Sequence, residues 1–304
     1  MVVSLFEIWA ALGRVLLPVQ GLAESGDVST PPSSEEAPSS GEVPSSEETI
    51  AIRARSFGAI AREYDRVRPS YPDALVDDVV ALLPGTAVVE SGAGTGKATV
   101  LFAARRVRMS CVEPDPRMAA VLSENCRDFP NVSVTVSAIE DFEATGPFDG
   151  LIAAQSWHFT DPARRWVKAA SLLREGGLLA LFWNRTQEHL SPLVPAITEI
   201  YRRHEIFVSN EDADKGPPAW PRDEMETQET FTDVEVRAYY SVHIYSTQEW
   251  CDFLASSSHL LVLEPARRKA VLADVAQVID EAGGVLEEHR RCDLYLARRS
   301  DLPV

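Results

Sequence analysis

The chain has 304 residues, and 45% of them are hydrophobic, so it can bury the core of one large domain or of two small ones. It carries 29 Lys and Arg against 46 Asp and Glu, a formal net charge of -17 that repels a phosphate backbone unless basic residues gather on one face. Nucleic acid is therefore a poor candidate partner. The four cysteines form no C-x-x-C pair and have no histidine at metal-ligand spacing, so we expect reduced thiols and no metal site.

An apolar extension occupies residues 1–22. Glu7 and Arg14 interrupt it, and no basic residue precedes it, whereas a signal peptide has a basic start and an unbroken apolar centre. The same two charges make it a marginal membrane span. Three interpretations stay open: an amphipathic or unstructured extension, a membrane-associated anchor, and a poor secretion signal. For the whole protein we expect a cytoplasmic location and no membrane partner.

Residues 23–50 are rich in Ser, Pro and Glu, with a six-residue repeat visible between Pro32 and Glu48. Such a segment cannot bury enough apolar surface to order itself, so we predict a disordered linker. The first fifty residues hold eight acidic residues and one basic residue, so the domain predicted over residues 51–304 is less acidic than the whole chain.

Two helices are predicted between Arg53 and Leu83. The second begins near Ser70, has Pro72 in its first turn and shows apolar residues at helical spacing. Both helices precede the first predicted strand, so we expect them to cap the sheet and to cover a ligand.

A glycine-rich turn follows the apolar strand that begins at Ala87. Glycines at 92, 94 and 96 allow positive φ angles and a close approach of the backbone to a ligand. Their G-x-G-x-G spacing departs from the G-x-G-x-x-G of dinucleotide-binding dehydrogenases, and Glu90 stands two residues ahead of the first glycine. The pattern favours a nucleotide-binding turn, although glycine-rich turns also join strands to helices without any ligand.

The next strand, Val107 to Val112, ends in Glu113-Pro114-Asp115. An acidic residue about 20 positions after the glycines accepts hydrogen bonds from both ribose hydroxyls and repels a 2′-phosphate. A ribose is therefore expected beside Glu113, and NADP is disfavoured.

Helices and strands then alternate, which predicts a doubly wound parallel sheet. We expect a helix from Asp161 that ends just before Gly176, followed by a fifth strand over Leu178–Trp183. Residues 185–230 break the alternation with a helical stretch and a Pro-containing loop, so we predict a helical insertion that acts as a lid over the ligand edge. Alternation then returns with a strand over 234–245, a helix capped by Ser246, a long helix over 265–282 and a last strand near 294–297.

Three of these segments resemble the class I S-adenosylmethionine (SAM)-dependent methyltransferases, in particular the small-molecule group called methyltransferase type 11 or UbiE-like. They are the turn Glu90–Gly96, the Glu113-Pro114-Asp115 turn and the run from Phe148 to His158, and the resemblance extends from about Arg53 to Arg299. It implies an α/β fold with a Rossmann-like, mostly parallel seven-stranded sheet, whose last strand inserts antiparallel between strands five and six. It also implies SAM as the cofactor and a small organic molecule as the methyl acceptor.

The resemblance further implies the residues that contact the cofactor. Gly92 and its neighbours would meet the methionine part, and Glu113 would bind the ribose. Glu140 would reach the adenine amino group unless it is a solvated loop carboxylate, and Arg68 would hold the methionine carboxylate unless it is a surface residue. The implied set is Tyr64, Arg68, Glu90, Gly92, Ala93, Gly94, Glu113, Pro114, Met118, Ile139, Glu140 and Gln155.

His158 is the candidate catalytic residue, because it follows the fourth strand, where the family places residues near the acceptor. A histidine there can act as a general base, since its pKa lies near neutrality. The alternative is a histidine that packs with Trp157 beneath the lid.

Methyl transfer from a sulfonium to an oxygen, carbon or nitrogen nucleophile needs no metal, and positioning can carry most of the rate. Two other functions stay open at this point. One is a SAM-binding protein without transfer activity, and the other is a nicotinamide-dependent oxidoreductase, which the glycine spacing and Glu90 disfavour.

The linker interpretation predicts that removing residues 1–48 shifts the melting temperature by no more than about two degrees, because a Ser/Pro/Glu segment makes few buried contacts. Differential scanning fluorimetry of the full and truncated chains measures the shift. A loss of many degrees would mean that the extension docks on the domain.

Overall fold

The computed structural model describes residues 57–187, 190–206 and 218–302. Its centre is a seven-stranded sheet in the order β3-β2-β1-β4-β5-β7-β6. The first five strands run parallel, and β7 pairs antiparallel with both β5 and β6. The expected fold class, with the last strand inserted antiparallel, is therefore confirmed. The strands are β1 (Ala87–Ser91), β2 (Arg108–Glu113), β3 (Val132–Val136), β4 (Phe148–Ala154), β5 (Leu173–Thr186), β6 (Phe231–Ser246) and β7 (Val285–Arg299).

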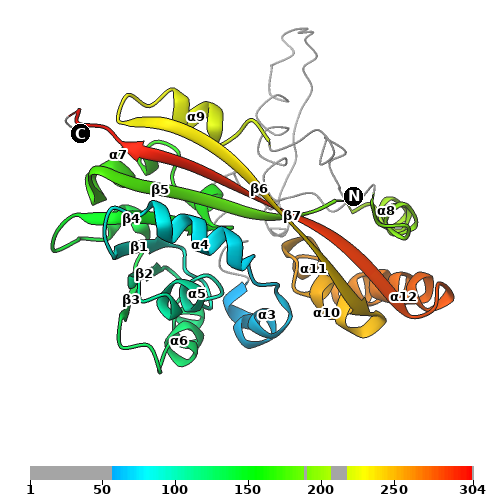
Figure 1. Cartoon of the computed structure of the whole chain (residues 1–304). Helices are drawn as coiled ribbons and strands as arrows, with labels where there is room; N and C mark the ends of the chain where they lie inside the picture. The colour runs from blue at the N-terminus through cyan, green and yellow to red at the C-terminus, as the bar shows by residue number, and fades with distance from the viewer. Residues whose placement is uncertain (1–56, 188–189, 207–217, 303–304) are drawn as a thin grey trace, which may run out of the picture.

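Helices cover both faces of this sheet, as Figure 1 shows. The two predicted cap helices are present as α3 and α4, ahead of the first strand. The helical segments are η1 (Phe57–Ile60), α3 (Ala61–Val67), α4 (Asp73–Leu82), α5 (Thr99–Ala104), α6 (Pro116–Asn125), η2 (Ile139–Asp141), η3 (Trp157–Phe159), α7 (Arg165–Leu172), α8 (Val194–Arg203), α9 (Arg222–Glu226), α10 (Thr247–Ala255), α11 (Ser258–Leu261) and α12 (Pro265–Glu281).

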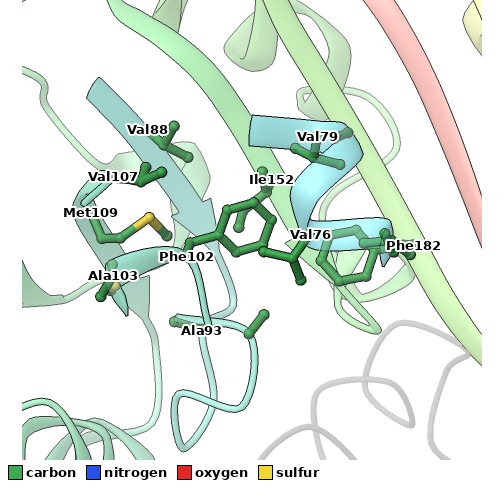
Figure 2. Packing of buried hydrophobic residues seen from close by; sticks show 14 of the residues in the cluster. Val76, Val79, Val88, Ala93, Phe102, Ala103, Val107, Met109, Ile152 and Phe182 are labelled. Carbon is green, nitrogen blue, oxygen red and sulfur yellow. The ribbon is translucent and has the colours of Figure 1, made fainter. Parts of the chain in front are cut away.

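One face of the sheet packs against α4, α5 and α6. Its core contains apolar residues of these helices together with every second residue of the central strands, as the two-residue period of a strand requires. Phe102 of α5 is fully buried, and in Figure 2 its ring lies between Met109 of β2 and Val76 of α4. Phe182 of β5 belongs to the same core cluster, and its ring meets that of Tyr71 edge to face.

The opposite face packs against α7, η3 and α9. Trp166 of α7 and Met225 of α9 join Leu181, Trp183 and Tyr295 in this second cluster. The strand order explains why helices cover both faces. β2 and β3 lie on one side of β1, and β4 and β5 lie on the other, so the connecting helices of the two halves fall on opposite faces. The order reverses between β1 and β4, and open α/β sheets bind ligands at the carboxyl ends of the strands beside such a reversal.

The boundary between α7 and β5 differs from the prediction. The helix ends at Leu172, and β5 starts at Leu173, before the glycine pair. Leu173 already pairs with Phe148 of β4, and Gly176 takes a φ of 71° that lets the strand bend and resume its pairing at Leu178. The helix therefore ends before the glycine that was predicted to follow it, because Leu173 already pairs with β4.

The described part of the predicted insertion lies in two places, with Met225 of α9 packed on one face of the sheet and α8 packed against other helices. In α8, Ile197 and Ile200 pack against Trp250 of α10 and Val275 of α12, at the far end of the long β6–β7 pair (Figure 1). Residues 207–217, which join α8 to the loop before α9, lie outside the described residues. The lid role of this insertion stays a prediction.

The apolar extension and the Ser/Pro/Glu linker also lie outside the described residues. Within the described ranges, no helix is long and apolar enough to cross a membrane.

Candidate functional site

A cavity opens at the carboxyl ends of β1, β2 and β4, beside the reversal of strand order. Its wall is built from the turn after β1, the end of β2, the segment before η2, the segment after β4 and the C-terminal part of α3. All twelve residues that the sequence predicted to contact a cofactor line this cavity, whereas His158 does not. Segments far apart in the sequence are thus brought to one site.

The glycine turn needs two of its glycines for different reasons. Gly92 has a φ of 62°, and a Cβ there would lie 2.6 Å from the Cβ of Ser156, so only glycine lets the turn pass the segment after β4. Gly94 has a φ of 58°, and a Cβ there would meet only Met118, at 3.7 Å. Gly94 therefore leaves open space on the cavity side of the turn, where a ligand can approach the backbone.

Four amides of this turn, including those of all three glycines, already have partners. The N–H groups of Gly92 and Ala93 donate to the Val112 carbonyl at 2.8 and 3.2 Å, and the Gly96 N–H donates to the Ala93 carbonyl at 2.9 Å. The Gly94 N–H donates to Glu113 at 2.8 Å. A pyrophosphate-binding turn offers its N–H groups to the ligand, so this turn suits a ligand whose nearest part is cationic or neutral.

Glu113 joins the two central turns. Its Oε2 accepts the bond from Gly94, and its Oε1 accepts one from the Asp115 N–H at 2.9 Å. Burial raises the pKa of this carboxyl. Each oxygen has further acceptor capacity, so the carboxylate can take two more hydrogen bonds from a ribose without breaking the turn.

Glu90 is 1% exposed, and it lines the floor of the cavity at the end of β1. Its Oε2 accepts hydrogen bonds from Thr99 Oγ1 at 2.6 Å and from the Cys111 thiol at 3.8 Å. Burial is the largest influence on this group and raises its pKa to about 7. The bond from Cys111 to Glu90 is a contact that residue spacing alone does not reveal, because it depends on the register between β1 and β2.

Arg68, just after α3, forms part of the cavity wall. Its guanidinium lies 5.0 Å from the ring centroid of Tyr64 and 5.1 Å from that of Phe253, and its Nη2 donates to the Ser256 carbonyl at 2.9 Å. Burial lowers the pKa of Arg68. Its Nε is buried and has no hydrogen-bond partner among the described residues, so this partly buried cation suits an anionic group of a ligand.

The adenine side of the predicted site is also assembled. Ile139 is buried in η2, and Met118 lines the cavity beside Gly94. Glu140 is tied to the neighbouring loop, because its Oε1 accepts a hydrogen bond from the Asp161 N–H at 2.7 Å. Gln155 has a φ of 60°, a strained backbone conformation for a residue that is not glycine and one that tends to occur at functional sites.

Ion pairs hold α3 against the cavity. Asp65 lies 3.6 Å from Lys97, which follows the glycine turn and lines the cavity. Arg62 pairs with Glu124 of α6 at 2.7 Å, and Arg66 pairs with Asp252 of α10 at 2.6 Å. Lys97 was not singled out from the sequence, because its partner lies on a helix that only the fold brings near.

His158 lies behind the cavity wall, in η3. The Trp183 indole Nε1–H donates to its Nδ1 at 3.3 Å. Burial, with the nearby charges of Arg185 and Arg165, lowers the pKa of His158 to about 3. The His158 ring lies against that of Phe159, with the centroids 4.1 Å apart, and Trp157 is fully buried beside Trp166.

Comparison with known proteins decides the family. Residues 88–177 match the family described as a methyltransferase domain. An uncharacterized methyltransferase of Mycobacterium tuberculosis is 32% identical over 227 residues, which cover 74% of this chain and 85% of that protein. The chain belongs to the class I SAM-dependent methyltransferases. The cofactor of this methyltransferase is SAM.

Two further similarities agree with this assignment. A probable SAM-dependent methyltransferase of Saccharomyces cerevisiae is 27% identical over 146 residues, covering 46% of this chain and 50% of that protein. The solved structure of a putative type II methyltransferase from Anaeromyxobacter dehalogenans superposes with a TM-score of 0.57 at 20% identity, over 78% of this chain and 99% of that one. The latter similarity supports the fold.

The residues present in the cavity fit SAM. The cofactor carries an ammonium and a sulfonium, and the methyltransferase offers the buried Glu90 carboxyl and a turn whose amides are already occupied. It carries a ribose, for which Glu113 has acceptor capacity, and a carboxylate, for which Arg68 is a cation. The described residues include no group of His, Cys, Asp or Glu side chains able to hold a metal ion.

The raised pKa of Glu90 predicts a pH-dependent stability of the cofactor-free protein. Between its ordinary value of 4.5 and about 7, the folded state holds a proton that the unfolded state releases. The free energy of unfolding therefore falls as pH rises through this window and stays reduced above it. Glu90→Gln should remove this contribution. The fall in the free energy of unfolding between pH 5 and pH 8 should therefore be smaller in the variant than in the parent, by up to about 3 kcal/mol.

Urea denaturation of both proteins at pH 5 and pH 8 measures the difference, and Glu143→Gln, at an exposed carboxylate outside the cavity, is the control. An unchanged difference between pH 5 and pH 8 in Glu90→Gln would contradict the raised pKa.

Proposed function

We propose that this methyltransferase transfers the methyl group of SAM to an oxygen, carbon or nitrogen atom of a small organic molecule, with the cofactor in the cavity at the ends of β1 and β2. The observation that carries the proposal is the Glu113 carboxylate, which orders the glycine turn and still has acceptor capacity toward the cavity. We take residues 51–304 as the methyltransferase domain.

The cofactor-binding roles follow from the contacts. Glu113 accepts the ribose hydroxyls, and Arg68 takes the methionine carboxylate as a charge-assisted bond. Glu90 and the carbonyls of the glycine turn face the cationic part of the cofactor. Pro114, Met118 and Ile139 lie against the adenine, with Glu140 at its amino group and Tyr64 and Gln155 closing the methionine end.

When bound, SAM supplies an electrophilic methyl group whose leaving group is a neutral thioether. The chain contributes position, because a sulfonium displacement is an in-line reaction that needs the acceptor aligned behind the methyl group. The Asp65–Lys97 pair holds α3 beside the glycine turn, and the Arg66–Asp252 pair ties α3 to α10, so α3 can restrict the access of water to the site.

Incubation of the full chain with methyl-labelled SAM and a cellular metabolite extract tests the proposal. We expect label in a small molecule, identified by mass spectrometry. Labelled protein or nucleic acid with no labelled small molecule would contradict the acceptor class. SAM binding without any labelled product would favour a binding protein that performs no transfer.

Glu113→Ala should weaken S-adenosylhomocysteine (SAH) binding by about 1.5 to 3 kcal/mol, the scale of hydrogen bonds to a charged acceptor. Isothermal titration calorimetry measures the affinity, and a melting curve confirms that the variant is folded. The matched control is Glu143→Ala, at an exposed carboxylate outside the cavity. Unchanged affinity in a folded Glu113→Ala protein would remove the ribose role, and tighter binding of NAD than of SAH would overturn the cofactor site.

A further inference from the structure

One edge of the sheet carries an exposed row of apolar side chains. The strand at this edge is β6, drawn in yellow in Figure 1, which has β7 as its single neighbour in the order of the described strands. Tyr240, Val242 and Ile244 occupy every second position of β6, so their side chains share one face. They are 67%, 54% and 61% exposed. Proteins usually interrupt such an edge with charged residues, and an apolar row that is left exposed indicates an interaction surface.

The pairing of β7 shows where the backbone groups of this row point. Val242 lies opposite His289, whose carbonyl accepts a hydrogen bond from the Gln187 N–H at 2.7 Å, just after the end of β5. The N–H and C=O of one residue in an antiparallel strand point to the same side, so His289 bonds on the β5 side and makes no ladder bonds with Val242. The N–H and C=O of Val242 therefore point to the open edge. Those of Tyr240 and Ile244, two positions to either side, point the same way.

The segment that forms this edge is nearly symmetric about its central valine. Residues 238–246 read Ala-Tyr-Tyr-Ser-Val-His-Ile-Tyr-Ser, with no proline and no Asp, Glu, Lys or Arg. Two copies that pair antiparallel about this valine place Tyr240 opposite Ile244 of the second copy, and Tyr239 opposite Tyr245. Aromatic residues opposite aromatic or β-branched ones are favourable cross-strand pairs, and no like charges meet in this register. The strand is therefore complementary to itself.

The charged side chains near the row are engaged with one another. Arg237 donates to Glu235 of the same strand at 2.7 Å, and the His289 ring is hydrogen-bonded to Glu287 at 2.6 Å on the neighbouring strand. A charged partner would have to compete with these contacts, whereas a second copy of β6 brings apolar side chains and backbone groups that match the row. A second copy thus fits this surface better than a charged strand does.

We propose that the chain forms a homodimer in which β6 pairs antiparallel with β6 of a second copy, with the two-fold axis at Val242. Such an interface uses the same surface on both copies and joins their sheets into one. This inference goes beyond the proposed function and does not rest on it, because none of the three residues of the row lines the cofactor cavity. A short strand interface is small, so we expect a dissociation constant on the order of micromolar.

Sedimentation velocity of the full chain between about 1 and 100 µM tests the dimer, since this range spans the expected dissociation constant. Val242→Lys places two like charges opposite each other at the axis, and it should raise the dissociation constant at least about tenfold. The matched control is Val136→Lys, because Val136 is 55% exposed on β3, the other edge of the sheet. The control should dimerise as the parent does, and melting curves check that both variants are folded.

Cysteine cross-linking tests the register. Val242→Cys places the two new thiols opposite each other, whereas Ile244→Cys separates them by four residues, or about 14 Å along the strand. With a short thiol-specific cross-linker, we expect covalent dimers from Val242→Cys and few from Ile244→Cys. The parent chain is the background control, because its own cysteines are buried or half-buried.

A full chain that stays monomeric at about 100 µM would overturn the proposal. So would a folded Val242→Lys protein that dimerises like the parent, a dimer that Val136→Lys weakens as much, or equal cross-linking of the two cysteine variants. A dimer that forms only after residues 1–48 are removed would also contradict it, because the N-terminal extension would then be the occupant of the row in the full chain.

Discussion

The hydrogen bonds of the Glu113 carboxylate hold the site together. One oxygen accepts from Gly94 in the turn after β1, and the other accepts from Asp115 in the turn after β2. Asp115 in turn caps α6, accepting from the Arg117 N–H at 2.8 Å. One buried side chain thus couples two strand ends, the glycine turn and a helix start, and the position of a ribose follows from where this carboxylate points.

This arrangement places two acidic side chains where ionisation is unfavourable. Glu90 and Glu113 are both buried at the same cavity, and burial raises the pKa of each. Two carboxyl groups that resist ionisation are unfavourable for a structural core, yet they suit a cofactor that brings positive charge and hydroxyl donors. Arg68 is a cation instead, partly buried between Tyr64 and Phe253, and it suits the cofactor's anionic end. The cavity therefore carries its charges where the ends of SAM are expected to lie.

Local signals allowed much of the fold and the cofactor site to be predicted from the sequence. The glycine turn, the acid that ends β2 and the capping box at Ser246 are short patterns with a physical cause, and the structure shows each in place. Pairing between distant segments was less predictable. The start of β5 at Leu173 depends on its pairing with β4, the Cys111–Glu90 contact depends on strand register, and the Lys97–Asp65 pair depends on how α3 folds back. The state of His158 depends on Trp183, a residue 25 positions away on the neighbouring strand.

The most direct test of the account is a crystal structure of the full chain with SAH. We expect both ribose hydroxyls within about 2.6–3.2 Å of the Glu113 oxygens, while the bonds to Gly94 and Asp115 persist. A ribose bound elsewhere, or a Glu113 carboxylate that contacts only its own backbone partners, would contradict the account.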